Sequence, residues 1–182
     1  MGAKRLFVAI PVPDIVKDEI RSVAEKLGEM DKIIPEQNWH ITVHFLGDTP
    51  EKEIPSLLEK LSHGVADIPA FTLSFQDIIV KKSGFRAMIW VRGEPSQAFV
   101  KLVRKVEMLT DGKEQRKPIP HITLSRIKKK PFERKNLPVA FKSSLTWKVE
   151  HIELWESKLS RENSLYTNLG SFKLKDYEPK YR

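Results

Sequence analysis

Runs of apolar residues, several of them alternating with polar positions, predict strands along most of the chain. Glycine, proline and aspartate bound these runs and favour turns, and Lys81–Gly84 predicts a hairpin turn. The predicted strands are Lys4–Ile10, Trp39–Leu46, Phe71–Val80, Phe85–Arg92, His121–Ile127, Leu145–Leu159 and Tyr166–Leu174.

Apolar residues three and four positions apart predict helices between some of these strands. Asp14 suits an N-cap, Pro95 suits a first helical turn, and Gly28 and Gly112 end their runs. The predicted helices are Asp14–Leu27, Glu51–Leu61 and Pro95–Leu109. Because helices are mixed with predicted antiparallel hairpins, the expected class is α+β rather than a doubly wound parallel sheet. The chain has no GxGxxG or GxxxxGK[ST] loop.

The length of 182 residues predicts a single domain, residues 1–182, that is large enough to bury a core. The absence of cysteine excludes a disulfide framework, a thiol nucleophile and a cysteine-based metal site. No apolar run approaches the roughly 18 residues that a membrane-spanning helix needs, and the first ten residues do not resemble a signal peptide. We therefore expect a cytoplasmic protein with no membrane partner. Its richness in Lys and Glu is weakly typical of a thermophilic source.

Positive charge is concentrated in one stretch. The chain has a net charge of +8, and residues 113–135 hold nine cationic side chains against two acidic ones, a net +7. Such a segment indicates a polyanionic partner, with nucleic acid first and an anionic membrane second. A solvated surface that keeps the protein soluble is an equally open alternative.

One tetrapeptide occurs twice, as His40-Ile41-Thr42-Val43 and as His121-Ile122-Thr123-Leu124. In a strand, residues i and i+2 share a face, so each His lies beside its Thr and the aliphatic pair points the other way. A single copy would indicate only a polar face in solvent. Two copies indicate an internal duplication that brings two imidazoles together. Paired imidazoles form an acid–base couple near neutral pH, and hydroxyls with nearby cations bind phosphate oxygens.

These motifs resemble those of the 2H phosphoesterase superfamily, and the chain is most similar to its LigT-type RNA 2′,3′-cyclic phosphodiesterases. The resemblance covers nearly the whole chain. It is carried by Arg5–Ala9 before Pro11, by His40–Gly47, by Pro120–Arg126, and by a late segment, Leu154–Tyr166, with Ser157 and Tyr166.

The resemblance implies two pseudo-symmetric lobes, each a β-sheet packed by helices, with the active-site cleft between the sheets. It implies that His40 donates a proton to the leaving O3′, that His121 accepts one from water, and that Thr42 and Thr123 bind the phosphate. It also implies substrate contacts from Phe45 and Arg126. Strict alternation puts these last two on the face opposite the histidines, so a twist or bulge is expected there.

The implied reaction opens RNA 2′,3′-cyclic phosphate ends to 2′-phosphomonoesters with no metal and no cofactor. Expected partners are RNA with such ends, tRNA fragments among them, and nucleotides; the protein is expected to be a monomer. Lys128, Lys129 and Lys130 are predicted to bind flanking phosphates. Two alternatives stay open: RNA end joining to 2′-5′ linkages, and an RNA- or nucleotide-binding module without turnover.

Other histidines and aromatic residues are expected to play lesser roles. His40 and His44 share strand parity, but no carboxylate lies near to complete a zinc site. His44 is expected on the surface or in support of the motif. Trp39 is a candidate for the cleft wall. Three tryptophans lie in apolar strand patterns and are expected in the core: Trp90, Trp147 and Trp155.

Overall fold

The strands form one antiparallel sheet. The computed structural model describes residues 2–26, 33–83, 86–112, 118–127, 145–159 and 164–176. Within these residues an eight-stranded sheet has the order β6-β3-β4-β5-β2-β1-β7-β8. The strands are β1 (Ala3–Pro11), β2 (His40–Pro50), β3 (Phe71–Ser83), β4 (Arg86–Gly93), β5 (His121–Ile127), β6 (Leu145–Val149), β7 (His151–Leu159) and β8 (Ser164–Lys173).

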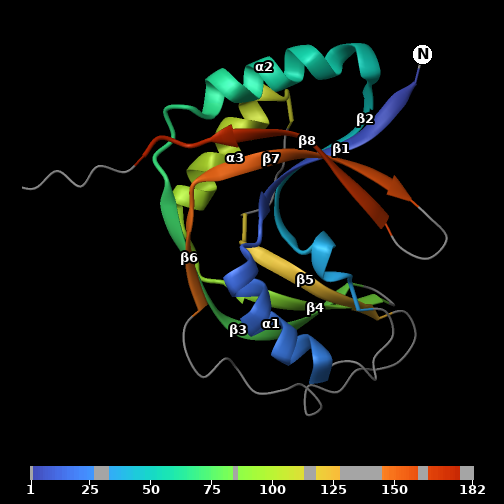
Figure 1. The fold of residues 1–182 in the computed structure, drawn as a ribbon, viewed down its shortest axis with the longest axis vertical. Helices are drawn as coiled ribbons and strands as arrows, with labels where there is room; N and C mark the ends of the chain where they lie inside the picture. The colour runs from blue at the N-terminus through green and yellow to red at the C-terminus, as the bar shows by residue number, and fades with distance from the viewer. Residues whose placement is uncertain are drawn as a thin grey trace, which may run out of the picture.

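The sheet has two four-stranded halves. Long ladders hold β2-β1-β7-β8 together and likewise β6-β3-β4-β5. In the described part of the chain, the ladder between β2 and β5 consists of the single pair Ile41 and Ile122. The α+β class and its two lobes are confirmed, and this one pair joins the two predicted sheets into a continuous curled one (Figure 1).

Three helices cover the outer side of the sheet: α1 (Asp14–Lys26), α2 (Ile54–Val65) and α3 (Gln97–Leu109). The helices α2 and α3 pack together over β8 and β2, whereas α1 packs on β6 of the other half (Figure 1). The predicted helix from Glu51 begins as a 3₁₀ turn, and α3 begins after Ser96, whose Oγ accepts a hydrogen bond from the Phe99 amide at 3.2 Å. No helix among the described ranges is long and apolar enough to cross a bilayer.

The strand β1 is buried on both faces. Leu6, Val8 and Ile10 belong to the main core beneath the helices. Phe7 and Ala9 point the other way and pack with Trp155 in a second apolar cluster. We call this second side of the sheet, opposite the helices, the site face. A strand covered on both sides has a continuous apolar run instead of an alternating one.

The prediction of one long strand over Leu145–Leu159 is wrong. The segment is broken at Glu150 into β6, which pairs with β3, and β7, which pairs with β1 in the other half. The buried side chains change parity at the break. In the main core, odd-numbered positions precede the break and even-numbered ones follow it: Leu145, Trp147 and Val149, then Ile152 and Leu154.

Candidate active site

The two repeated motifs meet where the halves of the sheet join. His40 is the first residue of β2 and His121 is the first residue of β5. Ile41 and Ile122, which pair across the junction, are fully buried in the main core. Side chains alternate along a strand, so the His and Thr that flank each isoleucine lie on the site face around this junction. The register therefore gathers both predicted pairs in one place.

The two imidazoles are held in the same way. The Nδ1–H of His40 donates to the Asn38 carbonyl at 2.7 Å, and that of His121 donates to the Ile119 carbonyl at 2.8 Å. A carbonyl oxygen only accepts, so each Nδ1 carries a proton. Nε2 is then the nitrogen that exchanges protons: it accepts when the ring is neutral and donates when the ring is charged. In His40 this Nε2 lies 3.2 Å from the Thr42 hydroxyl.

A β-bulge follows each motif at the same position. The β1–β2 register passes over Val43, and the β4–β5 register passes over Leu124. Each bulge leaves two successive buried residues, Val43 with His44 and Leu124 with Ser125. The next residue in each motif, Phe45 or Arg126, is then exposed on the site face. The predicted bulge is confirmed in both copies.

Aromatic rings surround His40. Its ring centroid lies 5.0 Å from that of Phe7, 5.3 Å from Trp155 and 5.4 Å from Tyr166. Burial lowers the pKa of His40 to about 4; positive charge on His121 and Arg126 acts in the same direction, and the bond to the Asn38 carbonyl opposes it. Without an anion beside it, His40 is therefore neutral at pH 7, and an anion placed nearby would favour its charged form.

His121 has a different environment. Its ring stacks on the indole of Trp90 with centroids 3.8 Å apart and planes inclined by 24°. Trp90 lies opposite Thr123 in the β4–β5 ladder and therefore belongs to the site face. The two histidines thus have the same type of backbone anchor, a carbonyl two residues upstream, and differ in the rings that contact them.

The structure corrects the predictions for several residues. Trp155 is buried as expected, but in the second apolar cluster, where its ring contacts His40; Trp90, also expected in the core, is only partly buried and stacks on His121. His44 is buried, and the bulge turns it away from the face of His40. Trp39 is buried with its indole N–H donating to the Ile34 carbonyl at 2.9 Å, so it does not line the site. Trp147 is in the core, as predicted.

Phe7 is a site residue that the sequence reasoning missed. The available signal was the uninterrupted apolar run of β1, which required both faces of the strand to be covered. Glu153 was also missed, although one of its carboxylate oxygens accepts the indole N–H of Trp155 and fixes that ring beside His40. The predicted contacts Lys128, Lys129 and Lys130 lie outside the described residues.

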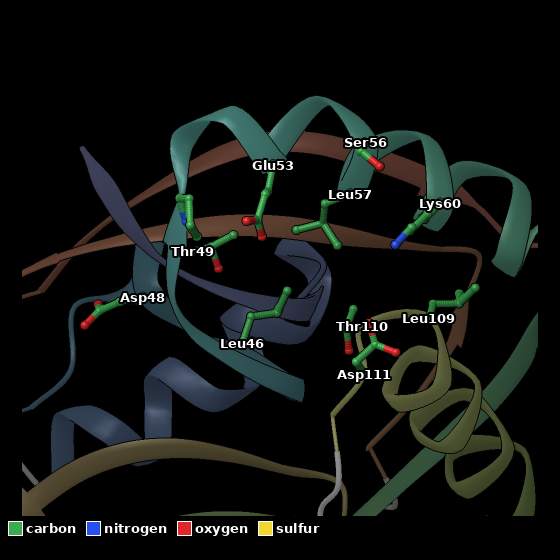
Figure 2. Close-up of a pocket in the computed structure, with 11 residues that line it drawn as sticks. Leu46, Asp48, Thr49, Glu53, Ser56, Leu57, Lys60, Leu109, Thr110 and Asp111 are labelled. Carbon is green, nitrogen blue, oxygen red and sulfur yellow. The ribbon is translucent and has the colours of Figure 1, made fainter. Parts of the chain in front are cut away.

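A cavity of about 380 Å³ lies elsewhere, between α2, the end of α3 and the end of β2 (Figure 2). Asp48, Glu53 and Asp111 contribute carboxylates to its lining and Lys60 contributes an amine. This charge is unfavourable for a phosphate, and no residue of either repeated tetrapeptide lines the cavity. Within the ranges that the structure describes, no group of three or more His, Cys, Asp or Glu side chains could hold a metal ion.

Known proteins resemble this chain along most of its length. Residues 12–161 match the model of the 2′-5′ RNA ligase superfamily. An RNA 2′,3′-cyclic phosphodiesterase of Thermus thermophilus is 31% identical over 184 residues, covering 94% of this chain and 90% of that protein. One of Methanocaldococcus jannaschii is 28% identical over 181 residues, covering 89% and 96%.

Solved structures share the fold. The structure of the protein TT0787 of Thermus thermophilus has a TM-score of 0.78 at 26% identity and covers 96% of this chain and 100% of its own. That of Escherichia coli LigT in apo form has a TM-score of 0.78 at 23% identity, with 96% and 99% covered.

Proposed function

The chain belongs to the 2′-5′ RNA ligase superfamily, and on this premise we propose that it is an RNA 2′,3′-cyclic phosphodiesterase that uses His40 and His121 as an acid–base pair. The relatives that carry this activity in their names match most of the chain. The observation that carries the proposal is the equivalent anchoring of the two rings, Nδ1–H to a carbonyl two residues upstream. This anchoring leaves two Nε2 atoms for chemistry.

The proposed reaction is an in-line displacement at phosphorus. His121 Nε2 takes a proton from water as the water oxygen bonds to phosphorus. The P–O3′ bond breaks, and His40 Nε2–H gives its proton to O3′, so the product is a 2′-phosphomonoester. The choice of O3′ as leaving group and the assignment of acid and base to the two histidines rest on the family resemblance, and the two available Nε2 atoms support the pairing.

Neighbouring side chains suit the binding of the phosphate. The hydroxyls of Thr42 and Thr123 share the site face with the histidines and can donate to non-bridging oxygens. Arg126, which the second bulge turns to that face, adds a fixed positive charge. Phe45 is 63% exposed beside Phe7 and offers an apolar surface to a ribose or base.

Substrate binding is proposed to charge the acid. With a pKa of about 4 for His40, roughly one molecule in a thousand carries the imidazolium at pH 7 before substrate binds. The cyclic phosphate is an anion, and an opposite charge within a few ångströms favours the charged ring. The substrate thereby supplies the electrostatic condition under which His40 becomes a proton donor.

We further propose that the reaction needs no metal. Imidazoles, hydroxyls and a guanidinium provide proton transfer and charge neutralisation, the two functions that a metal ion would otherwise supply. RNA with cyclic phosphate ends, including tRNA fragments, is the proposed substrate class, and the acting species is proposed to be a monomer.

An oligonucleotide ending in a 2′,3′-cyclic phosphate tests the proposal. We expect a product that resists a 3′-specific phosphatase and yields to a general one. A 3′-phosphate product would overturn the regiochemistry, and the absence of turnover with retained binding would favour a binding module. The superfamily description favours end joining as a second candidate. Adding an oligonucleotide with a 5′-hydroxyl tests it, because a 2′-5′ joined product requires the same acid and base.

A further inference from the structure

The contact between Trp90 and His121 is closer and flatter than the ring contacts of His40. The His121 ring lies 3.8 Å from the Trp90 ring at 24°, whereas the rings around His40 lie at least 5.0 Å away and are inclined by 43° to 85°. The Ile119 carbonyl fixes His121 Nδ1 at 2.8 Å. This hydrogen bond constrains the direction of the ring, and the stacked face constrains its tilt.

A flat indole affects the charge of the imidazole above it. The face of an aromatic ring is negative and attracts a cation within about 6 Å of its centroid, most strongly for tryptophan. His121 becomes a cation when it accepts the proton from water. The indole therefore stabilises the state that the base reaches during the reaction.

The charged surroundings of His121 make this stabilisation important. The Lys81 amine lies 5.9 Å from the centroid of Trp90, and Arg92 lies directly opposite His121 in the ladder. On the described strands around the ring, cationic groups come from Lys81 of β3, Arg92 of β4, Arg126 of β5 and His40 of β2, and Asp77 of β3 lies opposite Arg92 in the ladder. The cationic groups among these oppose a positive charge on His121.

We propose that Trp90 is a positioning residue for His121: it sets the tilt of the imidazole and stabilises its charged form, which makes His121 the base of the pair. Burial gives His40 the opposite tendency, to release a proton. Where the environments of two titratable groups shift their pKa values in opposite directions, one group is suited to act as acid and the other as base. The kinetic part of this inference rests on the proposed function, whereas the ring contact does not.

The indole of Trp90 acts through its face and not through its N–H. Its Nε1 is buried and has no hydrogen-bond partner among the described residues. Trp90→Phe therefore keeps an aromatic face and removes no hydrogen bond. Trp90→Leu and Trp90→Met remove the face, and the longer methionine side chain retains more of the packing volume.

The test follows the Cε1–H signal of His121 in the free protein by NMR as the pH changes. We expect Trp90→Leu and Trp90→Met to lower the titration midpoint of His121 by about 0.4 to 1.5 pH units, and Trp90→Phe to restore most of the difference. Trp147→Phe is the matched control, because Trp147 stacks on Phe75 in the core at 4.8 Å and 8°. It should leave the His121 midpoint unchanged.

Activity on a 2′,3′-cyclic mononucleotide is the second readout. We expect the Leu and Met variants to lower kcat by about 2- to 30-fold with little change in KM, and the Phe variant to recover most of it. An unchanged His121 midpoint in a folded Leu or Met variant overturns the proposal. If Trp90→Leu does not fold, the Trp90→Met and Trp90→Phe variants provide the same comparison. A shifted midpoint with unchanged kcat overturns the catalytic part. Wild-type protein without turnover overturns the proposed function, and the NMR result still decides the contact.

Discussion

Replacing His40 with glutamine is expected to remove a pH dependence from the stability of the fold. Burial among Phe7, Trp155 and Tyr166 lowers the pKa of His40 to about 4 in the folded protein, whereas a histidine in an unfolded chain has a pKa of about 6.5. Above pH 6.5 the ring is neutral in both states. As the pH falls from 6.5 to 4, the unfolded chain binds a proton that the folded protein does not, so the free energy of unfolding falls.

The size of this effect follows from the two values. The free energy of unfolding falls by about 3 kcal/mol in total, a decrease that is complete below pH 4, and by about 2 kcal/mol at pH 5. His40→Gln also alters the packing, so the measured quantity is the change in stability between pH 7.5 and pH 5 and not the stability at one pH. The wild type should lose about 2 kcal/mol more over this interval than His40→Gln.

Urea unfolding at both pH values, in buffers without phosphate, measures the difference. His63→Gln is the control, because His63 is exposed in the last turn of α2. Its loss should equal that of the wild type. Parallel losses in the wild type and His40→Gln would refute the burial argument. In an NMR titration, inorganic phosphate should raise the pKa of His40, since an anion beside the ring favours its charged form.

Three other outcomes are expected. His40→Ala and His121→Ala should each lower kcat by about 10²–10⁴-fold, and steady-state assays of the double variant should show less than the product of the two losses, since the pair acts as a unit. Thr42→Ala and Thr123→Ala should each reduce kcat/KM by an amount equivalent to about 1–3 kcal/mol, measured with Thr→Ser variants as controls. Changing Lys128, Lys129 and Lys130 to Glu should raise KM for an oligonucleotide and flatten the salt dependence of its binding, by about 0.7 in logarithmic slope per lost phosphate contact. Turnover of a cyclic mononucleotide should not change, and equal effects on both substrates would argue against a role in binding flanking phosphates.

The sequence predicted the centre of the site because that part depends on local periodicity. Strand alternation placed His40 with Thr42 and His121 with Thr123, and each pair shares the site face in the structure. A bulge was expected because strict alternation puts Phe45 and Arg126 on the face opposite the histidines, whereas the resemblance makes them substrate contacts. Its positions at Val43 and Leu124 came only from the register of neighbouring strands.

Features that depend on which strands become neighbours were not predictable in this way. Trp90 and Trp155 lie in apolar patterns that fit a core strand, and only pairing of β4 with β5 and of β1 with β7 brings them to the histidines. The break at Glu150 has a sequence signal, because the apolar positions that enter the main core change from odd-numbered to even-numbered there. That signal is detected only if parity is followed residue by residue.

Conversion of an RNA oligonucleotide with a 2′,3′-cyclic phosphate end, in the presence of a chelator, tests the paired-histidine mechanism most directly. Wild-type protein should yield the 2′-phosphomonoester at an undiminished rate, and His40→Gln and His121→Gln should each be slower by about 10²–10⁴-fold while remaining folded. Loss of activity with the chelator that returns when zinc is added, or full activity in either histidine variant, would contradict the mechanism.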